Sequence, residues 1–588
     1  MQLDAAIEIP GLGHIKRVVV VMFENRSFDH IFGALPGANG LLQDGQINQN
    51  YFNLSLPLEP PSPSNPPVYP ATVDPCMPMA HDFTHDFGDG MMPDLFGPTF
   101  TVAGTCCSGA GASYTSGYAN GAPTGQIQPV APTYPATNSG FYTTFNSCEP
   151  QGQAALTYFK DGDLRVLTTL ANNFVVCDNW YCDMPGHTLP NRSFFHCGTT
   201  GSVGIDDTDK GRNTTPTIFD LIDQLPLEDQ ALGWKMYAPV AEAGGKTLLG
   251  QLDTVFLNSN VQNYPGVPIT EFTADCQNDT LPFYSFIMCW LPNSCCDEWT
   301  DTSMHPNSLV QPAENLLAAV YNTLRNSPCW DDTLLVVTFD ENGGIYDHVF
   351  PPQTTPPDPA RPIVTQSVVG CCGNTWMLNS QFDFSLLGLR VPALLISPWL
   401  AVGVDSHQYQ NTSVLRFLIN RMNAEFGKDF APLTQRDANA PEIEAAFIQF
   451  GQNQMRQECP EWIEPYKTLP RTDPNTGSNA IPYCEGKLAI WTPPHSILNA
   501  APVAYINELL NIYLAPLPGH PDSGKKITRD YATNADVANY TEERVRAANH
   551  FYEEAPRMHD QMNGPNLEAT PDWTRNDDID RQTAEQEL

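Results

Sequence analysis

Basic residues are scarce in this chain. Its 588 residues include 29 lysines and arginines against 66 aspartates and glutamates, so the formal net charge at pH 7 is −37. A surface of that sign repels nucleic acids and anionic membranes, because both carry negatively charged phosphate groups. We therefore expect no nucleic-acid partner, and at most a transient contact with a membrane surface.

Long apolar runs are also missing, and none approaches the roughly 20 residues that a membrane-spanning helix needs. The first residues, MQLDAAIEIPGLGHIKR, lack the charged and apolar segments of a signal peptide. Cysteine is abundant, with 16 residues and no paired CxxC zinc pattern, which favours disulfides and a few buried thiols. The cysteine content slightly favours secretion and the N-terminus does not, so the compartment stays open.

Buried strands alternating with amphipathic helices are the main pattern of the chain. Residues 36–150 are rich in Pro, Gly, Ser and Asn, which is typical of loops. Apolar strand-like runs occupy 173–177, 333–339 and 391–400, and helical patterns occupy 311–326 and 411–422. This alternation predicts an α/β protein, a three-layer α/β/α sandwich with a mostly parallel central sheet and long loop insertions.

Two of the predicted strands end in adjacent oxygen-bearing side chains. The run VVVVMF is followed by Glu24 and Asn25, and TLLVVTF is followed by Asp340 and Glu341. Ligands bind outside the carboxyl ends of parallel strands, so these four side chains meet if the strands are neighbours. Carboxylates that close repel one another unless a cation neutralises them, which favours a divalent metal ion. The alternative is that the acidic residues merely cap helices.

A third segment, CDMPGHTLPNRSFFH, places Thr188 directly before a predicted helix. Such a threonine is an ordinary N-cap. It is equally a hydroxyl at a helix N-terminus, where amide donors suit a phosphate group and a neighbouring metal would activate it as a nucleophile. Histidines that follow turn residues, at positions 81, 85, 305, 348 and 407, are candidate phosphate contacts or general acids.

The motifs ENRSFDHIFG, TLPNRSFFHCGTTG and TFDENGGIYDHVFPP, in this order and followed by TSVLRFL, resemble a known family. It is the phosphoesterase family of non-specific phospholipases C and a related acid phosphatase. The resemblance covers residues 14–425 and implies an alkaline-phosphatase-like fold that cleaves phosphate esters at a metal. We expect a catalytic domain over 1–430, with 36–150 as a loop-rich insertion. The residues beyond it are loop-rich and helical in pattern, so we expect a C-terminal extension over 431–588 that packs on this domain and ends in a polar tail.

The resemblance also implies the site residues. One divalent ion (Ca²⁺, Mg²⁺, Mn²⁺ or Zn²⁺) would be held by Glu24, Asn25, Asp340 and Glu341. Thr188 takes the nucleophile position, which is Ser in some relatives and Thr in others. Asn191 would hold a phosphoryl oxygen and His81 would contact the phosphate, with His85 as the alternate. His305 would be a further contact or the general acid.

The substrate class is less determined than the reaction. The acid phosphatase branch carries an additional mid-chain histidine pair, and no histidine lies between His196 and His305 here. We therefore expect a phospholipase C that cleaves phospholipid head groups. An acid phosphatase acting on small phosphomonoesters is the alternative, and a catalytically silent phosphate- or lipid-binding protein is the alternative of another class. The complete acidic pairs and the threonine favour an enzyme.

Overall fold

The computed structural model describes the chain in ranges separated by gaps. The described residues are 9–43, 46–47, 71–73, 75, 79, 83, 85, 91, 94–95, 138, 140–142, 152–200, 215–225, 233–238, 266–289, 302–306, 308–357, 366–369, 375–378, 384–466, 468–473, 477–484 and 487–488. Most of the loop-rich segment 36–150 lies outside them, and so does His81. The chain divides into two compact units, residues 1–75 with 82–465, and residues 76–81 with 466–588.

The first unit is built on an eight-stranded sheet with the order β15-β6-β14-β11-β1-β10-β8-β9. Its strands are β1 (Arg17–Phe23), β6 (Val175–Cys177), β8 (Trp234–Ala238), β9 (Val267–Pro268), β10 (Tyr284–Met288), β11 (Thr333–Phe339), β14 (Ala393–Ile396) and β15 (Gly403–Asp405). Only β14 runs antiparallel to its neighbours β11 and β6, and the other described pairings in this sheet are parallel. The predicted mostly parallel sheet is confirmed.

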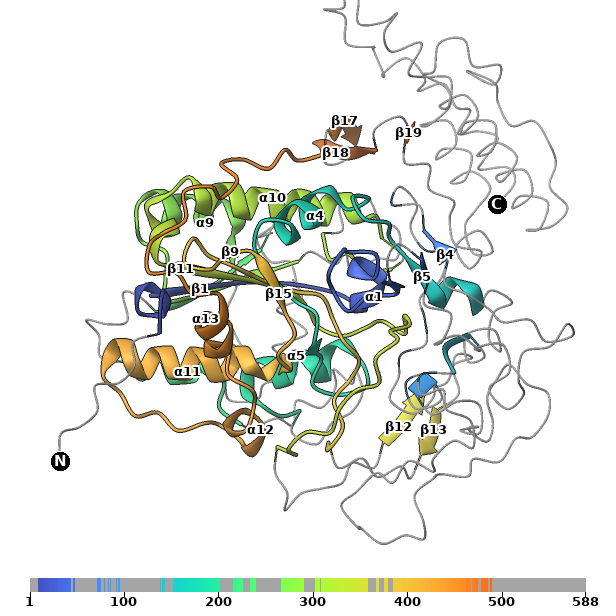
Figure 1. Ribbon diagram of the computed structural model, residues 1–588, viewed down its shortest axis with the longest axis horizontal. Coiled ribbons are helices and arrows are strands. Elements are labelled where there is room, and N and C mark those ends of the chain that lie inside the picture. The colour runs from blue at the N-terminus through green and yellow to red at the C-terminus, as the bar shows by residue number, and fades with distance from the viewer. Residues whose placement is uncertain are drawn as a thin grey trace, which may run out of the picture. The chain divides into compact units, whose positions relative to one another are not determined.

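Helices cover both faces of this sheet, so the unit has three layers (Figure 1). One face carries α4 (Arg165–Ala171), α9 (Ile269–Gln277) and α10 (Val310–Arg325). The other carries α5 (Thr188–Cys197), α6 (Ile218–Ile222), α11 (Thr412–Phe426), α12 (Gln435–Ala438) and α13 (Glu444–Phe450), of which α5, α6 and α12 all contact α11. The predicted α/β/α sandwich is therefore confirmed. None of the described helices is both long and apolar enough to cross a bilayer.

The remaining elements are short. In the first unit they are η1 (Leu12–His14), α1 (Phe28–Phe32), β2 (Leu42–Gln43), β3 (Gln46–Ile47), β4 (Ala71–Thr72), η4 (Gly152–Leu156), β5 (Thr157–Tyr158), β7 (Trp180–Tyr181), η7 (Pro328–Asp332), β12 (Gln366–Val369), β13 (Thr375–Leu378) and β16 (Tyr409–Gln410). The second unit holds a three-stranded sheet of β17 (Thr468–Asp473), β18 (Gly477–Cys484) and β19 (Lys487–Leu488). The sequence analysis did not predict these three strands. The boundary at residue 430 between the catalytic domain and the C-terminal extension stays a prediction.

The two central strands, β1 and β11, form the core of the sheet. All residues of both strands are buried, as their unbroken apolar runs predict. They pair in parallel from Arg17 opposite Thr333 to Phe23 opposite Phe339, so both strands end at the same level. Each fully buried valine or leucine here stabilises the fold by about 1.5–3 kcal/mol. The pairing brings the residues that follow the two strands to one place.

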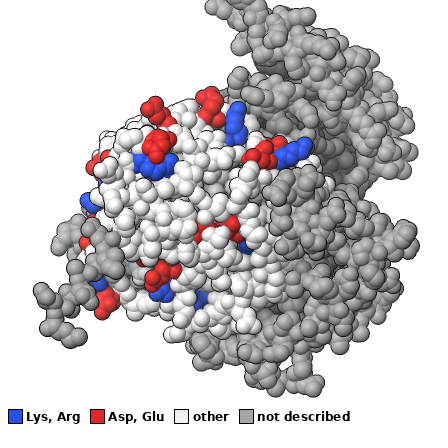
Figure 2. Space-filling model, in the orientation of Figure 1, with Lys and Arg blue, Asp and Glu red and all other residues white. Residues whose placement is uncertain are grey.

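Cysteine side chains in the described part of the chain are buried free thiols, and no disulfide is seen among them. They are Cys177, Cys182, Cys197, Cys276, Cys289, Cys329 and Cys459. The predicted disulfides are therefore not found at these positions, and the side chains of the remaining cysteines lie outside the description. On the face drawn in Figure 2, acidic and basic side chains form small mixed groups, without an extended basic patch among the described residues.

His196 makes the stability of the first unit depend on pH. It is buried on α5 beside the rings of Phe219 and Phe286, at centroid distances of 5.1 and 4.9 Å. Burial, helped by the charge of Arg192, lowers the pKa of His196 to about 3. An unfolded histidine takes up its proton near pH 6.5, so between these values the unfolded state binds more protons and stability falls as the pH falls.

We expect the wild-type protein to lose about 2 kcal/mol more free energy of unfolding between pH 7 and pH 5 than a His196→Phe variant. Phenylalanine keeps the aromatic contacts and has no proton to gain. Urea denaturation at both pH values measures the difference. Equal losses in the two proteins would show that His196 does not titrate in this way.

Candidate active site

The four predicted metal ligands lie together at the ends of β1 and β11. Glu24, Asn25, Asp340 and Glu341 are all buried, with no more than 1% of any residue exposed. The backbone N–H of Asn25 donates to Oδ1 of Asp340 over 3.0 Å, although the two residues are 315 positions apart. The backbone N–H of Glu341 donates to the same oxygen over 2.7 Å. The residues that follow β1 and β11 therefore lie together, as the sequence predicted.

Asn25 depends on Gly343 for its position. The backbone of Asn25 is left-handed, with φ of 59°, which asparagine tolerates better than most residues. Gly343 is also left-handed, and a Cβ atom on it would lie 2.3 Å from the carbonyl oxygen of Asn25. The glycine after the acidic pair therefore allows the two strand-end loops to approach closely.

Thr188 begins α5 and faces Asn25. Its Oγ1 donates to Oδ1 of Asn25 over 3.2 Å. The loop before it, residues 184–187, is held by the amide of Asn191, which donates to three carbonyl oxygens of this loop and accepts from the N–H of Met184. The structure therefore brings Thr188 to the predicted ligands. The contact of Asn191 with a phosphoryl oxygen stays a prediction, and its observed bonds position the loop before Thr188.

Two histidines meet the other side of the Asn25 amide. Its Nδ2 lies 2.9 Å from Nε2 of His305 and 3.4 Å from Nε2 of His85, and both ring nitrogens accept because an amide nitrogen only donates. Nε2 of His85 also lies 3.6 Å from Oε1 of Glu341. His85, the alternate in the sequence interpretation, is at the site, whereas the preferred His81 lies outside the described residues.

Two arginines of the site were missed by the sequence reasoning. Arg26 donates from Nε to the carbonyl of Met304 over 2.7 Å and from Nη2 to that of His305 over 3.1 Å, which holds His305 in place. Arg192 donates to carboxylates of both strand ends. Arg26 follows Asn25 directly, and Arg192 lies four residues after Thr188 on the same helix face, so both had a positional signal.

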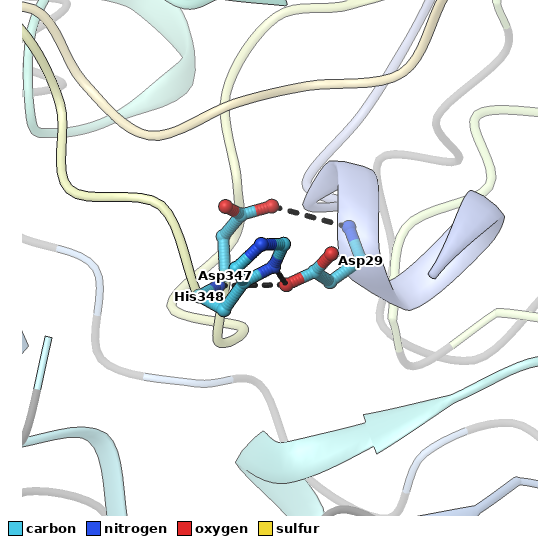
Figure 3. Close-up of side chains that lie close together, drawn as sticks. All are labelled: Asp29, Asp347 and His348. Carbon is cyan, nitrogen blue, oxygen red and sulfur yellow. Dashed lines mark hydrogen bonds and ion pairs between the residues drawn. The ribbon is translucent and has the colours of Figure 1, made fainter. Parts of the chain in front are cut away.

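A second buried cluster lies beside the site and ties its loops together (Figure 3). Nδ1 of His348 lies 2.7 Å from Oδ2 of Asp29, and the side chains come from the loop after β11 and from α1. Arg390 donates to Oδ1 of Asp29 over 3.0 Å and to Oδ1 of Asp347 over 2.9 Å. Burial would raise the pKa of Asp29, but the charges of His348 and Arg390 outweigh it and lower that pKa.

This second cluster has ligand atoms within 4.8 Å of one another, close enough to hold a metal. The guanidinium of Arg390, however, already binds both carboxylates and is fully buried among them. A buried arginine between two carboxylates supplies the compensating charge that a cation would otherwise bring. We therefore interpret this cluster as an ion-pair network that fixes the two strand-end loops, and metal binding by the first cluster stays a prediction.

The Phosphoesterase family matches residues 15–424 of the chain. The chain belongs to this family. It is accordingly a hydrolase that acts on phosphoric ester bonds, and the resemblance seen in its motifs is confirmed.

This phosphoesterase is similar to non-specific phospholipase C5 of Arabidopsis thaliana, with 28% identity over 76% of this chain and 76% of the relative. It is also similar to phospholipase C B of Mycobacterium tuberculosis, with 29% identity over 74% of this chain and 78% of the relative. A solved protein of the alkaline phosphatase superfamily from Vibrio parahaemolyticus aligns with 67% of this chain and 81% of its own at 12% identity and a TM-score of 0.24. The fold class rests on the strand order and helix layers of this chain itself.

We expect Gly343→Ala to damage this phosphoesterase more than Gly37→Ala does. Both glycines are left-handed, but a Cβ atom on Gly37 meets nothing within 4 Å. Gly37→Ala therefore carries backbone strain alone, about 1–2 kcal/mol, with unchanged activity. Gly343→Ala adds a clash with Asn25, so we expect a greater loss of stability and a kcat/KM lowered more than about tenfold.

Urea denaturation and hydrolysis of p-nitrophenyl phosphorylcholine measure the two effects. Equal results for the two glycine variants would mean that the approach of Gly343 to Asn25 does not matter.

Proposed function

We propose that this phosphoesterase is a phospholipase C that uses Thr188 as its nucleophile. The observation that carries the proposal is the 3.2 Å contact between the Thr188 hydroxyl and the Asn25 amide, beside three buried carboxylates at one corner of the sheet. The printed names of the related phospholipases C of Arabidopsis thaliana and Mycobacterium tuberculosis support the substrate class. The product would be diacylglycerol and a phosphorylated head group.

The donor set fits a divalent metal ion. Glu24, Asp340 and Glu341 are carboxylates with almost no exposure, and Asn25 adds an amide oxygen. The guanidinium of Arg192 binds Glu24 and Asp340 of this set and supplies one positive charge. Hard oxygen donors of this kind suit Mg²⁺, Ca²⁺, Mn²⁺ or Zn²⁺. When bound, such an ion supplies Lewis-acid stabilisation of negative charge on the hydroxyl and the phosphoryl oxygens.

The residues of the chain then have separate tasks. Thr188, at the N-terminus of α5, gives up its hydroxyl proton to solvent and attacks phosphorus in line, and the bond from phosphorus to the diacylglycerol oxygen breaks as the new phosphorus–oxygen bond forms. Asn25 accepts the bond that orients the hydroxyl. The positive end of the α5 dipole, at which Thr188 lies, favours negative charge on the phosphoryl oxygens. Water then cleaves the phosphothreonine ester and releases the head-group phosphate.

His305 is the proposed general acid for the leaving oxygen. Its Nε2 lies 2.9 Å from the Asn25 amide nitrogen and the Thr188 hydroxyl lies 3.2 Å from the Asn25 amide oxygen, so the two groups are close together. Since Nε2 accepts from Asn25 in this structure, the acid role requires a protonated His305 that exchanges this contact for the leaving oxygen. His85 is 3.4 Å from the same amide nitrogen and beside Glu341, a position suited to a phosphate contact. His81 keeps its predicted role as a further phosphate contact.

We expect Thr188→Ala to lower kcat/KM for phosphatidylcholine by about a thousandfold or more, because the nucleophile is lost. Thr188→Ser, the matched control, keeps a hydroxyl and should stay within about tenfold of wild type. A chelator should abolish activity, and one of Ca²⁺, Mg²⁺, Mn²⁺ or Zn²⁺ should restore it. The assay uses neutral phosphatidylcholine vesicles and p-nitrophenyl phosphate side by side.

Full activity of Thr188→Ala would show that Thr188 is not the nucleophile. Hydrolysis of p-nitrophenyl phosphate without hydrolysis of phosphatidylcholine would make the protein a phosphatase. If neither substrate is hydrolysed with any of the four metals, the protein is better described as a catalytically silent phosphate- or lipid-binding protein.

His305→Gln should separate substrates by their leaving groups. The alkoxide of diacylglycerol needs a proton, whereas p-nitrophenolate leaves without one. We expect kcat for phosphatidylcholine to fall by about a hundredfold and kcat for p-nitrophenyl phosphorylcholine to change far less. The control, His85→Gln, should affect both substrates alike. If His305→Gln slows both equally, His305 is not the acid.

A further inference from the structure

The short helix α12 contacts the chain at both ends of α5, the helix that begins with Thr188. Before α5, Nη1 of Arg436 on α12 donates to the carbonyl oxygen of Asp183 over 2.6 Å. After α5, Oγ1 of Thr434, the N-cap of α12, lies within hydrogen-bond distance, 3.1 Å, of the carbonyl oxygen of Gly198. A helix far along the chain therefore holds the helix of the proposed nucleophile at two points.

The Arg436 side chain is fully buried and bonds to three segments of the chain. Besides its bond to Asp183, its Nε donates to the carbonyl oxygen of Thr355 over 2.6 Å, and its Nη2 donates to that of Phe384. Its guanidinium carbon also lies 4.6 Å from the ring centre of Phe194, which is on α5 itself. Because the planar guanidinium forms several directional bonds at once, it cannot move without breaking them, and it gives α5 a rigid support.

Asp183 connects this support to the loop before Thr188. Its carboxylate lies 3.2 Å from Nη1 of Arg436. It also accepts from the backbone N–H and the hydroxyl of Thr412, the first residue of α11, over 2.8 and 2.7 Å. Asp183 is thus bonded to both α11 and α12. The loop that begins at the next residue ends at Thr188, so the position of Asp183 limits where the Thr188 hydroxyl can lie.

α12 lies outside the part of the chain that the family match covers. The match ends at residue 424, whereas α12 spans Gln435–Ala438 and belongs to the compact unit that continues to residue 465. It also lies beyond the predicted end of the catalytic domain at residue 430. The contacts of α12 therefore connect residues beyond the matched region to the helix that carries the proposed nucleophile.

We propose that Arg436 is a positioning residue for the reaction, which acts through Asp183 to fix the place of Thr188. The property that it maintains is the 3.2 Å contact of the Thr188 hydroxyl with Asn25. This inference rests on the proposed function of Thr188 as the nucleophile. In-line attack depends steeply on the position of the attacking oxygen, and a displacement of about 1 Å can cost about a hundredfold in rate.

A positioning role differs from a purely structural role in the quantity that it changes. A residue that only stabilises the fold changes the fraction of folded protein, so each folded molecule keeps its activity well below the melting temperature. A residue that positions the nucleophile changes the rate of attack in the folded protein and leaves substrate binding nearly unchanged. The rate of attack in fully folded protein therefore decides between the two roles.

The test compares the full-length wild type, Arg436→Met and Arg436→Lys with p-nitrophenyl phosphorylcholine as the substrate, well below the melting temperature of each protein. Release of p-nitrophenolate with the enzyme in excess gives the rate of attack, and steady-state assays give kcat and KM. Arg421→Met is the matched control. Arg421 is a buried arginine on α11 that donates to the carbonyl oxygen of Ile15 over 2.9 Å, near the start of β1, whereas the site follows the end of that strand.

We expect Arg436→Met to lower the rate of attack and kcat by about a hundredfold, with KM within about threefold of the wild type. Arg436→Lys keeps the charge beside Asp183 but lacks the planar guanidinium that reaches three segments, so its rate should fall by about tenfold. Arg421→Met should melt at a lower temperature than the wild type and keep its rate of attack within about twofold.

A rate of attack in Arg436→Met within about twofold of the wild type would overturn the proposal, and so would a raised KM with unchanged kcat. Equal slowing by Arg421→Met would also overturn it, because any loss of stability would then have the same effect. If Arg436→Met does not fold, Arg436→Lys decides, and a lysine variant as fast as the wild type overturns the proposal.

Thr188→Ala, assayed beside these variants, separates the two levels of the proposal. If Thr188→Ala keeps full activity, the proposed function of Thr188 itself fails. If Thr188→Ala is inactive and Arg436→Met is as fast as the wild type, only the role of Arg436 fails.

Discussion

The site depends on the parallel pairing of β1 with β11, which ends level at Phe23 and Phe339. A carboxylate residue follows each strand directly, Glu24 after β1 and Asp340 after β11. Because both strands stop at the same height, the backbone N–H of Asn25 can donate to Asp340. A shift of the register by one residue would turn every side chain of a strand to the other face and separate these groups. The unbroken burial of both strands makes such a shift costly.

Buried arginines hold several of the segments that surround the site. In a chain with only 29 basic residues, the side chains of four arginines are among its largest fully buried groups: Arg26, Arg192, Arg390 and Arg436. Each binds carbonyl or carboxylate oxygens of segments that surround the site. Breaking such a buried pair generally costs about 3–5 kcal/mol, because one charge is left uncompensated. Four of the cations of this acidic protein therefore fix segments around the site.

The sequence predicted the sheet well, and it predicted that the polar side chains after β1 and β11 lie together. Unbroken apolar runs are a local property, and the expectation that polar residues after parallel strands meet at one edge needs no knowledge of the loops. It predicted less about the groups that surround the ligands. The position of Arg192 four residues after Thr188 places it near the site, but the burial of Arg192 and Arg390 has no local signature, because arginine is usually exposed and only a partner from a distant segment makes its burial favourable. The choice between His81 and His85 depended on the path of a loop, for which periodicity carries no information.

By itself the sequence determined the fold class, the family and which residue types stand at the strand ends, since each depends on short segments whose burial or motif is local. Only the tertiary structure decided which of these groups touch. Asn25 meets Thr188, His305 and Asp340 across separations of 163, 280 and 315 residues. Contacts of that range follow from strand register and helix packing, in which the free energy is distributed over the whole core, so no single segment of the chain encodes them.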